Sequence, residues 1–158
     1  MAGSIEDNRE RLARNVNDLL QELRVALAGV QILFGFLFSI VFTEVYQRAS
    51  DLQRYAHLVA VLFAVVSVAL MTAPAAWHRL LFRQGRRAEI LQVSNRFAIA
   101  GLGCLAVAMS STVFLLADVV LGDWPAILAC ALTAVCFGVL WFALPLHRRS
   151  VTPAHERL

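Results

Sequence analysis

The residues best suited to proton or ion chemistry are few, and they fall near the ends of long apolar runs. Glu44, His57 and Asp118 lie at similar positions near one set of run ends. Two carboxylates and an imidazole can pass a proton between them, and such groups inside a membrane usually mark a transport path. Carriers normally hold a carboxylate deep in a helix, so this placement favours solvated interface residues. The three residues form a candidate outer ion or proton cluster.

A second polar group gathers at the opposite ends of the runs. It consists of Gln21, Glu22, Arg24, Gln31, His78, Arg79, Asn95 and Arg96. Such side chains can hydrogen-bond between helices or face a partner outside them. Two interpretations stay open: an inner polar network that joins three helices, which is favoured, or a docking face for a cytoplasmic partner.

No pattern typical of a catalytic, cofactor or metal site occurs in the sequence. Nucleophile-elbow, Walker, HExxH and glycine-rich fingerprints are all missing. Cys104, Cys130 and Cys136 lie inside apolar runs, and an odd number of unpaired thiols is typical of packing residues rather than of a disulfide framework. We therefore expect no catalytic residue, no cofactor and no metal, and we expect that the protein is not an enzyme.

Composition indicates the elements that must position these residues. The chain has 158 residues, of which 59% are hydrophobic and 16% charged. Soluble domains average about 45–50% apolar and 25% charged residues. A helix needs about 20 apolar residues to cross a bilayer. Four segments qualify, at residues 25–46, 56–77, 97–121 and 126–146. The predicted fold is all-α: four transmembrane helices in an antiparallel bundle, with an N-terminal amphipathic helix.

The arginines predict the orientation of these spans. Twelve of the fourteen flank the first span on its N-terminal side, fill the loop between the second and third spans, or follow the fourth. Positive charge marks the cytoplasmic side of a membrane. We expect a multi-pass protein of the cell membrane with both termini in the cytoplasm. Because these arginines flank apolar runs, the net charge of +3 indicates anionic lipid headgroups and not nucleic acid as the partner.

The chain divides into three parts on this interpretation. Residues 1–24 form a cytoplasmic segment in which Leu12, Val16, Leu19, Leu20 and Leu23 have helical spacing. Such a segment can lie on the inner membrane surface or continue directly into the first span. Residues 25–146 form the transmembrane domain, and residues 147–158 form a cytoplasmic tail.

Rows of small residues four apart predict how the spans pack, because small side chains let helices approach closely in lipid. The rows are Gly35, Ser39 and Thr43; Ala56, Ala60 and Ala64; Ala100, Cys104, Ala108 and Thr112; and Ala126, Cys130, Ala134 and Gly138. The four-residue turn at 122–125 makes the third and fourth spans neighbours. We expect a protein that acts by packing with a partner or with copies of itself. The alternative is a small oligomeric transporter or a proton- or cation-coupled carrier.

Three stretches resemble a family of small actinobacterial membrane proteins known only as a domain of unknown function. They are LLQELRVALAGVQILFGFL at 19–37, APAAWHRLLFRQGRR at 73–87 and NRFAIAGL at 95–102. The resemblance covers most of the chain, from about Glu6 to Arg148. It implies a bacterial protein with four spans and implies no activity.

Overall fold

The computed structural model describes the backbone of residues 2–81 and 87–151, and the side chains of residues 14, 18, 21–76 and 93–147. The described chain contains helices and no strand. The helices are α1 (Ala2–Ile40), α2 (Glu44–Gln47), α3 (Asp51–Leu81), α4 (Arg87–Leu121), α5 (Asp123–Phe137), the π-helix η1 (Gly138–Ala143) and α6 (Leu144–Val151). Four stretches are long and apolar enough to cross a membrane: Gln21–Ile40, Asp51–Ala76, Val93–Leu121 and Asp123–His147. The predicted number and approximate positions of the apolar helices are confirmed.

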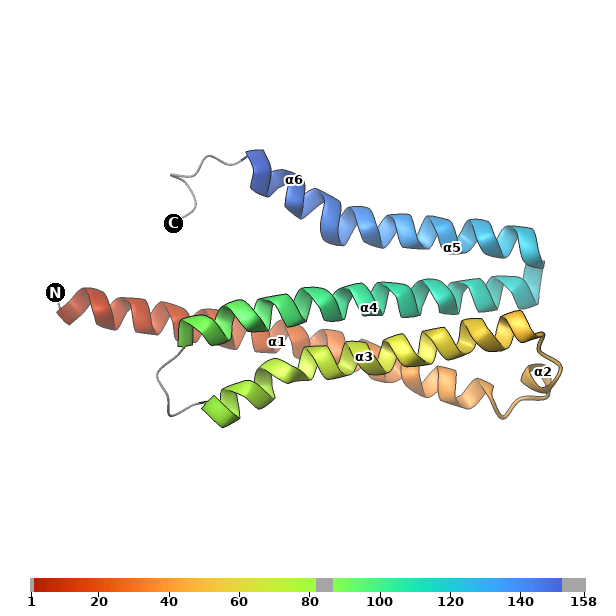
Figure 1. Cartoon of the computed structure of the whole chain (residues 1–158), viewed down its shortest axis with the longest axis horizontal. Helices are drawn as coiled ribbons and strands as arrows, with labels where there is room; N and C mark the ends of the chain where they lie inside the picture. Colours follow the sequence, from red (N-terminus) through yellow and green to blue (C-terminus); the bar gives the residue numbers. More distant parts are fainter. Residues whose placement is uncertain (1, 82–86, 152–158) are drawn as a thin grey trace.

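The long helices run antiparallel to one another in sequence order (Figure 1). The start of α1, the end of α3, the start of α4 and the end of α6 lie at one end of the molecule, and α2 and the α4–α5 turn lie at the other. Gly122, in that turn, has a φ of 89°, which glycine adopts without steric cost. The antiparallel course thus returns the chain, at the end of α6, to the side on which α1 begins.

The first helix follows one of the two predicted alternatives at its N-terminal end and stops earlier than predicted at its C-terminal end. The N-terminal segment continues without a break into the first apolar stretch, so α1 is one helix of 39 residues. It ends at Ile40, and the prediction that the first span extends to Tyr46 was wrong. Thr43 explains the break, because its hydroxyl donates to the Ile40 carbonyl at 2.7 Å and accepts the Tyr46 N–H at 3.3 Å. One side chain therefore caps both the end of α1 and the start of α2.

The core lies between α1, α3 and α4. The buried positions of α1 are seven residues apart, at Leu23, Val30 and Leu37, and those of α3 and α4 follow steps of three and four. Among the described side chains, the buried positions of α3 are His57, Ala60, Ala64, Ser67, Met71 and Pro74. Those of α4 are Ser94, Ala98, Gly101, Leu105, Ala108, Thr112 and Leu115, with Ser110 as one further buried position outside this spacing. This spacing keeps one seam facing its partner along the whole helix, as in coiled coils. Most of these side chains are small, so α3 and α4 form the most extensive helix pair.

The closest approach of α3 and α4 is at Ser67 and Gly101. The Ser67 hydroxyl donates to the Gly101 carbonyl at 2.8 Å, although the two residues belong to different helices. A Cβ atom placed on Gly101 would lie 2.9 Å from Cγ of Met71. Glycine therefore permits the close approach here, because a Cβ at this position would force the Met71 side chain to shift.

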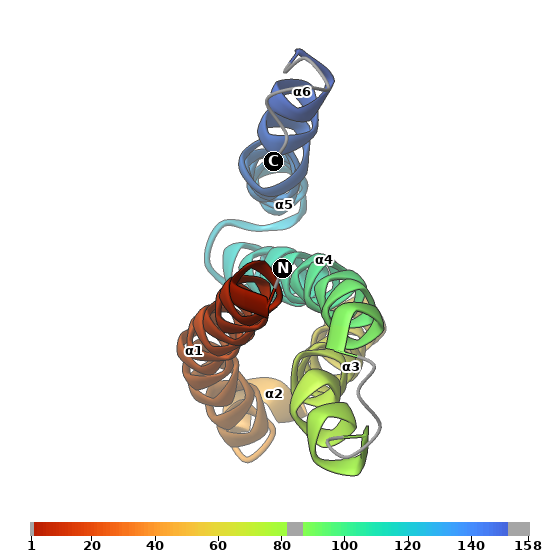
Figure 2. The same ribbon diagram turned by 90° about the vertical axis from the view of Figure 1, so that its left-hand side faces the viewer.

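The fourth apolar helix lies outside this core. α5 packs chiefly against α4, on the side away from α1 and α3 (Figure 2). At η1 the chain turns away from α4 (Figure 1), and the Leu144 N–H bonds to the carbonyl of Val139, five residues back. This loosened turn comes just before Pro145, which has no N–H to donate and whose ring clashes with the carbonyl four residues before it. The core therefore consists of three helices, α1, α3 and α4, and α5 packs on the outside of α4.

The predicted rows of small residues have different outcomes. The second row is confirmed at Ala60 and Ala64, which are fully buried. The first row was predicted to form a contact between helices. That prediction was wrong, since Gly35 and Ser39 are exposed. The third and fourth rows do not face each other along their lengths. Ala108 belongs instead to the core with α1 and α3, while Ala134 is exposed. The predicted rows took every fourth residue, whereas successive buried residues of the α3 and α4 seams are three and four residues apart in turn.

Candidate functional site

The end of the molecule that carries α2 holds a small group of buried polar side chains. His57 is the central one, with only 3% of its surface exposed. It lies two turns inside α3 and occupies the first position of the seam that continues through Ala60 and Ala64. Because the seam faces inward at every three- or four-residue step, the imidazole is held inside the core rather than at the surface.

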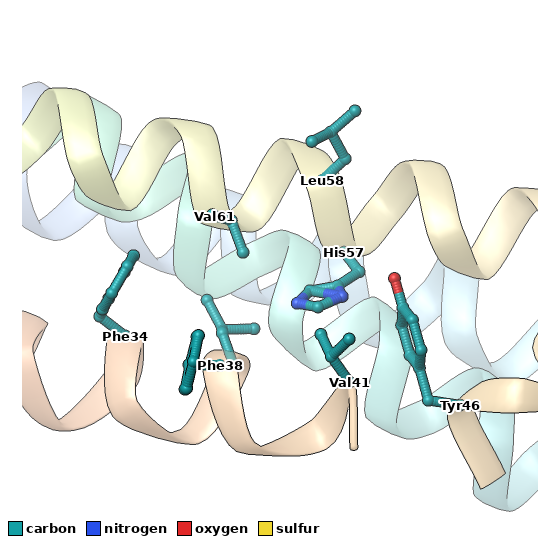
Figure 3. A pocket seen from close by; sticks show the side chains of 8 residues that line it. Phe34, Phe38, Val41, Tyr46, His57, Leu58 and Val61 are labelled. Carbon is teal, nitrogen blue, oxygen red and sulfur yellow. The ribbon is translucent and has the colours of Figure 1, made fainter. Parts of the chain in front are cut away.

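An apolar cavity of about 250 Å³ adjoins His57, between the end of α1 and the start of α3. Its lining consists of Phe34, Leu37, Phe38, Val41, Tyr46, His57, Leu58 and Val61. The imidazole points from α3 towards Phe38 and Val41 at the end of α1 (Figure 3). The Tyr46 ring stands at 89° to it, with ring centroids 4.9 Å apart. This edge-to-face contact is a favourable aromatic geometry, and it fixes the position of the imidazole at the cavity wall.

The Nε2 atom of His57 is buried and has no hydrogen-bond partner. Polar atoms in this situation are rare, because a buried donor or acceptor loses its bonds to water and normally finds a replacement. Oδ1 of Asp118 is a second such atom. The cluster therefore holds two unsatisfied polar atoms near one end of the core.

Asp118 is positioned from α3 by Gln53. The Gln53 Nε2 donates to Asp118 Oδ2 at 2.7 Å, and its Oε1 accepts the Ser50 N–H at 2.9 Å. The Ser50 hydroxyl in turn accepts the Gln53 N–H at 3.3 Å. This reciprocal pair is a capping box at the start of α3. The amide that caps the helix is thus also the one that binds the α4 carboxylate.

The predicted outer cluster of Glu44, His57 and Asp118 is only partly brought together. His57 and Asp118 are in the same end of the core, whereas Glu44 is exposed in the first turn of α2. Tyr46 and Gln53 complete the site and were not predicted as members. The S-x-x-Q pattern at Ser50–Gln53 was the available signal for the glutamine. A role of the cluster in proton or ion movement stays a prediction.

The residues of the predicted inner polar network are placed as follows. Gln21, Glu22, Arg24, Gln31, Asn95 and Arg96 are all exposed on the helices. The side chains of His78 and Arg79 lie outside the described residues. Gln31 lines a second cavity of about 250 Å³ with Phe34, Val65 and Val68. That these residues act together, as a network between helices or as a docking face, stays a prediction.

Metal chemistry receives no support from the described side chains. Among them, no group of three or more histidine, cysteine, aspartate or glutamate residues could hold a metal ion. Cys104, Cys130 and Cys136 are free thiols distributed over α4 and α5. What the site offers is one imidazole and one carboxamide–carboxylate pair beside an apolar space.

Comparison with known proteins identifies the family. Residues 5–145 match the family described as "Family of unknown function (DUF6328)". No curated protein and no solved structure matches the chain. The match covers α1 to α5 and extends to Pro145, so it includes the whole core and the outer polar cluster. The chain is a member of the DUF6328 family, whose function is unknown.

Proposed function

We propose that this protein is a non-enzymatic, four-span protein of a bacterial cell membrane that acts by helix packing with copies of itself or with another membrane protein. The arginine distribution supports an orientation with both termini in the cytoplasm. The observation that carries the packing function is the position of α5. It packs chiefly against α4 and leaves most of its surface outside the core (Figure 2).

The free flank of α5 carries small residues along part of its length, after the exposed side chain of Ile127. Ala131 and Ala134 are exposed, and no atom lies within 4 Å of the place where a Cβ of Gly138 would be. With 3.6 residues per turn, these three small residues lie on one flank of the helix. Lipid-facing positions elsewhere on α5 carry larger side chains, such as Leu128 and Leu132. Small residues on an outer face are typical of surfaces that another helix approaches closely.

Disulfide trapping tests this proposal in the membrane. In a chain whose three cysteines are replaced by alanine, Ala134→Cys should form a disulfide-linked dimer on mild oxidation. The matched control is Leu132→Cys, which lies on another side of α5 and should give little dimer. Equal dimer yields at the two positions would show random collision and contradict self-association through this flank. Co-purification in mild detergent then tests for a different membrane protein as partner.

A proton- or cation-coupled carrier is the second candidate, favoured by the unsatisfied atoms of His57 and Asp118. Ionisable groups of this kind inside a helical membrane protein commonly serve transport. The test is pH-driven ion flux in liposomes, comparing the parent with a Glu44→Gln, Asp118→Asn double variant. Flux that vanishes in the variant would favour the carrier over the packing function.

A further inference from the structure

Two spaces of similar volume lie end to end between α1 and α3. The outer one adjoins His57 and Tyr46, the inner one adjoins Gln31, and Phe34 lines both. Each has a volume of about 250 Å³. For comparison, an engineered apolar cavity of about 150 Å³ binds benzene. The space next to His57 is thus large enough for a ring or a short chain, and the pair together for a longer molecule.

The chemistry of the walls restricts what can fill this space. Apart from His57 and Tyr46, the side chains that line the outer cavity are all hydrocarbon. Water is a poor occupant, because a buried water needs two to four polar partners. Phe38 and Leu58 are exposed on the outer surface, so the cavity is bordered by side chains that face the bilayer. A molecule dissolved in the lipid can therefore reach it between α1 and α3.

His57 supplies a buried polar atom at the wall of the cavity. Its imidazole is 97% buried, is fixed by the edge of Tyr46, and points to the cavity wall formed by Phe38 and Val41 (Figure 3). Its Nε2 has no partner within the protein. A ligand oxygen at this atom would restore the missing hydrogen bond, whereas a hydrocarbon chain would leave it unsatisfied.

The absence of a cationic side chain from the described lining indicates an uncharged head group. The nearest arginine on α3, Arg54, is exposed and donates to the Gln47 carbonyl at 3.3 Å. An anionic head placed at His57 would lose its hydration, and the described lining holds no arginine to pair with it, which makes binding costly. A hydroxyl or carbonyl group would need one hydrogen bond only.

We propose that the space between α1 and α3 binds an uncharged amphiphile from the bilayer. The ligand hydrogen-bonds His57 Nε2 through one hydroxyl or carbonyl oxygen, and its apolar part lies past Phe34 towards Gln31. This site is separate from the outer flank of α5, so it does not depend on self-association.

Photolabelling of the full chain in phosphatidylcholine vesicles tests the proposal with three probes of one length. All carry a diazirine on a decyl chain, and they end in a hydroxyl, a methyl or a carboxylate group. The alcohol should label the α1 and α3 cavity residues about 2- to 10-fold more than the alkane does, which corresponds to one net hydrogen bond. Unlabelled decanol should compete with this labelling, and decane should not.

Two substitutions assign the preference to His57. His57→Leu should reduce labelling by the alcohol to the level of the alkane, and His57→Gln, which retains a polar group, should restore part of it. The matched control is Thr72→Val, which removes a hydroxyl from the exposed side of α3 and should leave the labelling unchanged.

Three results would overturn the proposal. Equal labelling of the cavity by the alcohol and the alkane would mean that ordinary lipid chains fill it. Stronger labelling by the carboxylate probe would exclude the uncharged class of ligand. Alcohol labelling spread evenly over the outer surfaces of all the helices would show that no site exists. If His57→Leu does not fold, the competition between decanol and decane in the parent still decides the outcome.

Discussion

Replacement of Gly101 by leucine is the most direct perturbation of the core. A Cβ at this position would lie 2.9 Å from Met71 Cγ, and 3.4 Å from both Leu70 Cβ and the Ser67 carbonyl oxygen. Met71 is itself almost completely buried. A leucine side chain would therefore separate α3 from α4 and lengthen the hydrogen bond from Ser67 to the Gly101 carbonyl.

The expected cost is that of overpacking a well-packed core, about 1–3 kcal/mol. Loss of the interhelical hydrogen bond adds about 0.6 kcal/mol, the average for such bonds in membrane proteins. Leucine also favours a helix over glycine by up to about 1 kcal/mol, which acts in the opposite direction. Gly29→Leu measures the contribution of helix propensity alone. Gly29 is exposed on α1, and a Cβ at this position would meet no other atom within 4 Å.

Unfolding in mixed micelles, followed by far-UV circular dichroism as the fraction of denaturing detergent rises, measures the difference. Gly101→Leu should be less stable than Gly29→Leu by about 1–3 kcal/mol. A Gly101→Leu, Met71→Ala double variant should lose less stability than the two single variants together, because the leucine can enter the vacated space. Equal stability of the two leucine variants, or simple additivity in the double variant, would refute a close α3–α4 contact here.

Four further predictions concern other parts of the chain. Ala108→Leu should destabilise the protein by about 1–3 kcal/mol in the same unfolding assay, because this alanine is fully buried in the core. Gln53→Ala should cost about 1–3 kcal/mol, because it leaves a partly buried carboxylate oxygen on α4 without its donor at 2.7 Å; an unchanged midpoint would mean that water replaces the amide. A reporter fused after Leu158 should be cytoplasmic and one inserted at Ser50 should be external, and a periplasmic signal from the C-terminus would contradict the orientation. A peptide of residues 5–24 should become helical on anionic vesicles and not on neutral ones, as measured by circular dichroism; equal binding to both would leave its apolar face as the only driving force.

The end of α1 and the burial of His57 could not be predicted from the sequence. Residues 41–46 are apolar enough to continue a span, but the Thr43 hydroxyl bonds to both flanking helices and breaks the chain there. His57 lies near a span end, where an imidazole is normally hydrated. Its burial depends on the phase of the α3 seam, which begins at His57 and includes Ala60 and Ala64. The hydropathy of consecutive residues does not show which face of α3 turns towards the core.

The apolar helices themselves followed from the sequence alone, because the tendency to enter lipid is a sum over about 20 consecutive residues and needs no knowledge of neighbours. Which faces of those helices meet was decided only in the tertiary structure. Rows of small residues occur on all four spans, and pairings between such rows differ little in free energy. The exposure of Ala134 and the burial of Ala108 result from that competition. The cavity at His57 arises in the same way, because α3 packs closely on α4 through Gly101, while Phe34 and Phe38 line an open space between α3 and α1.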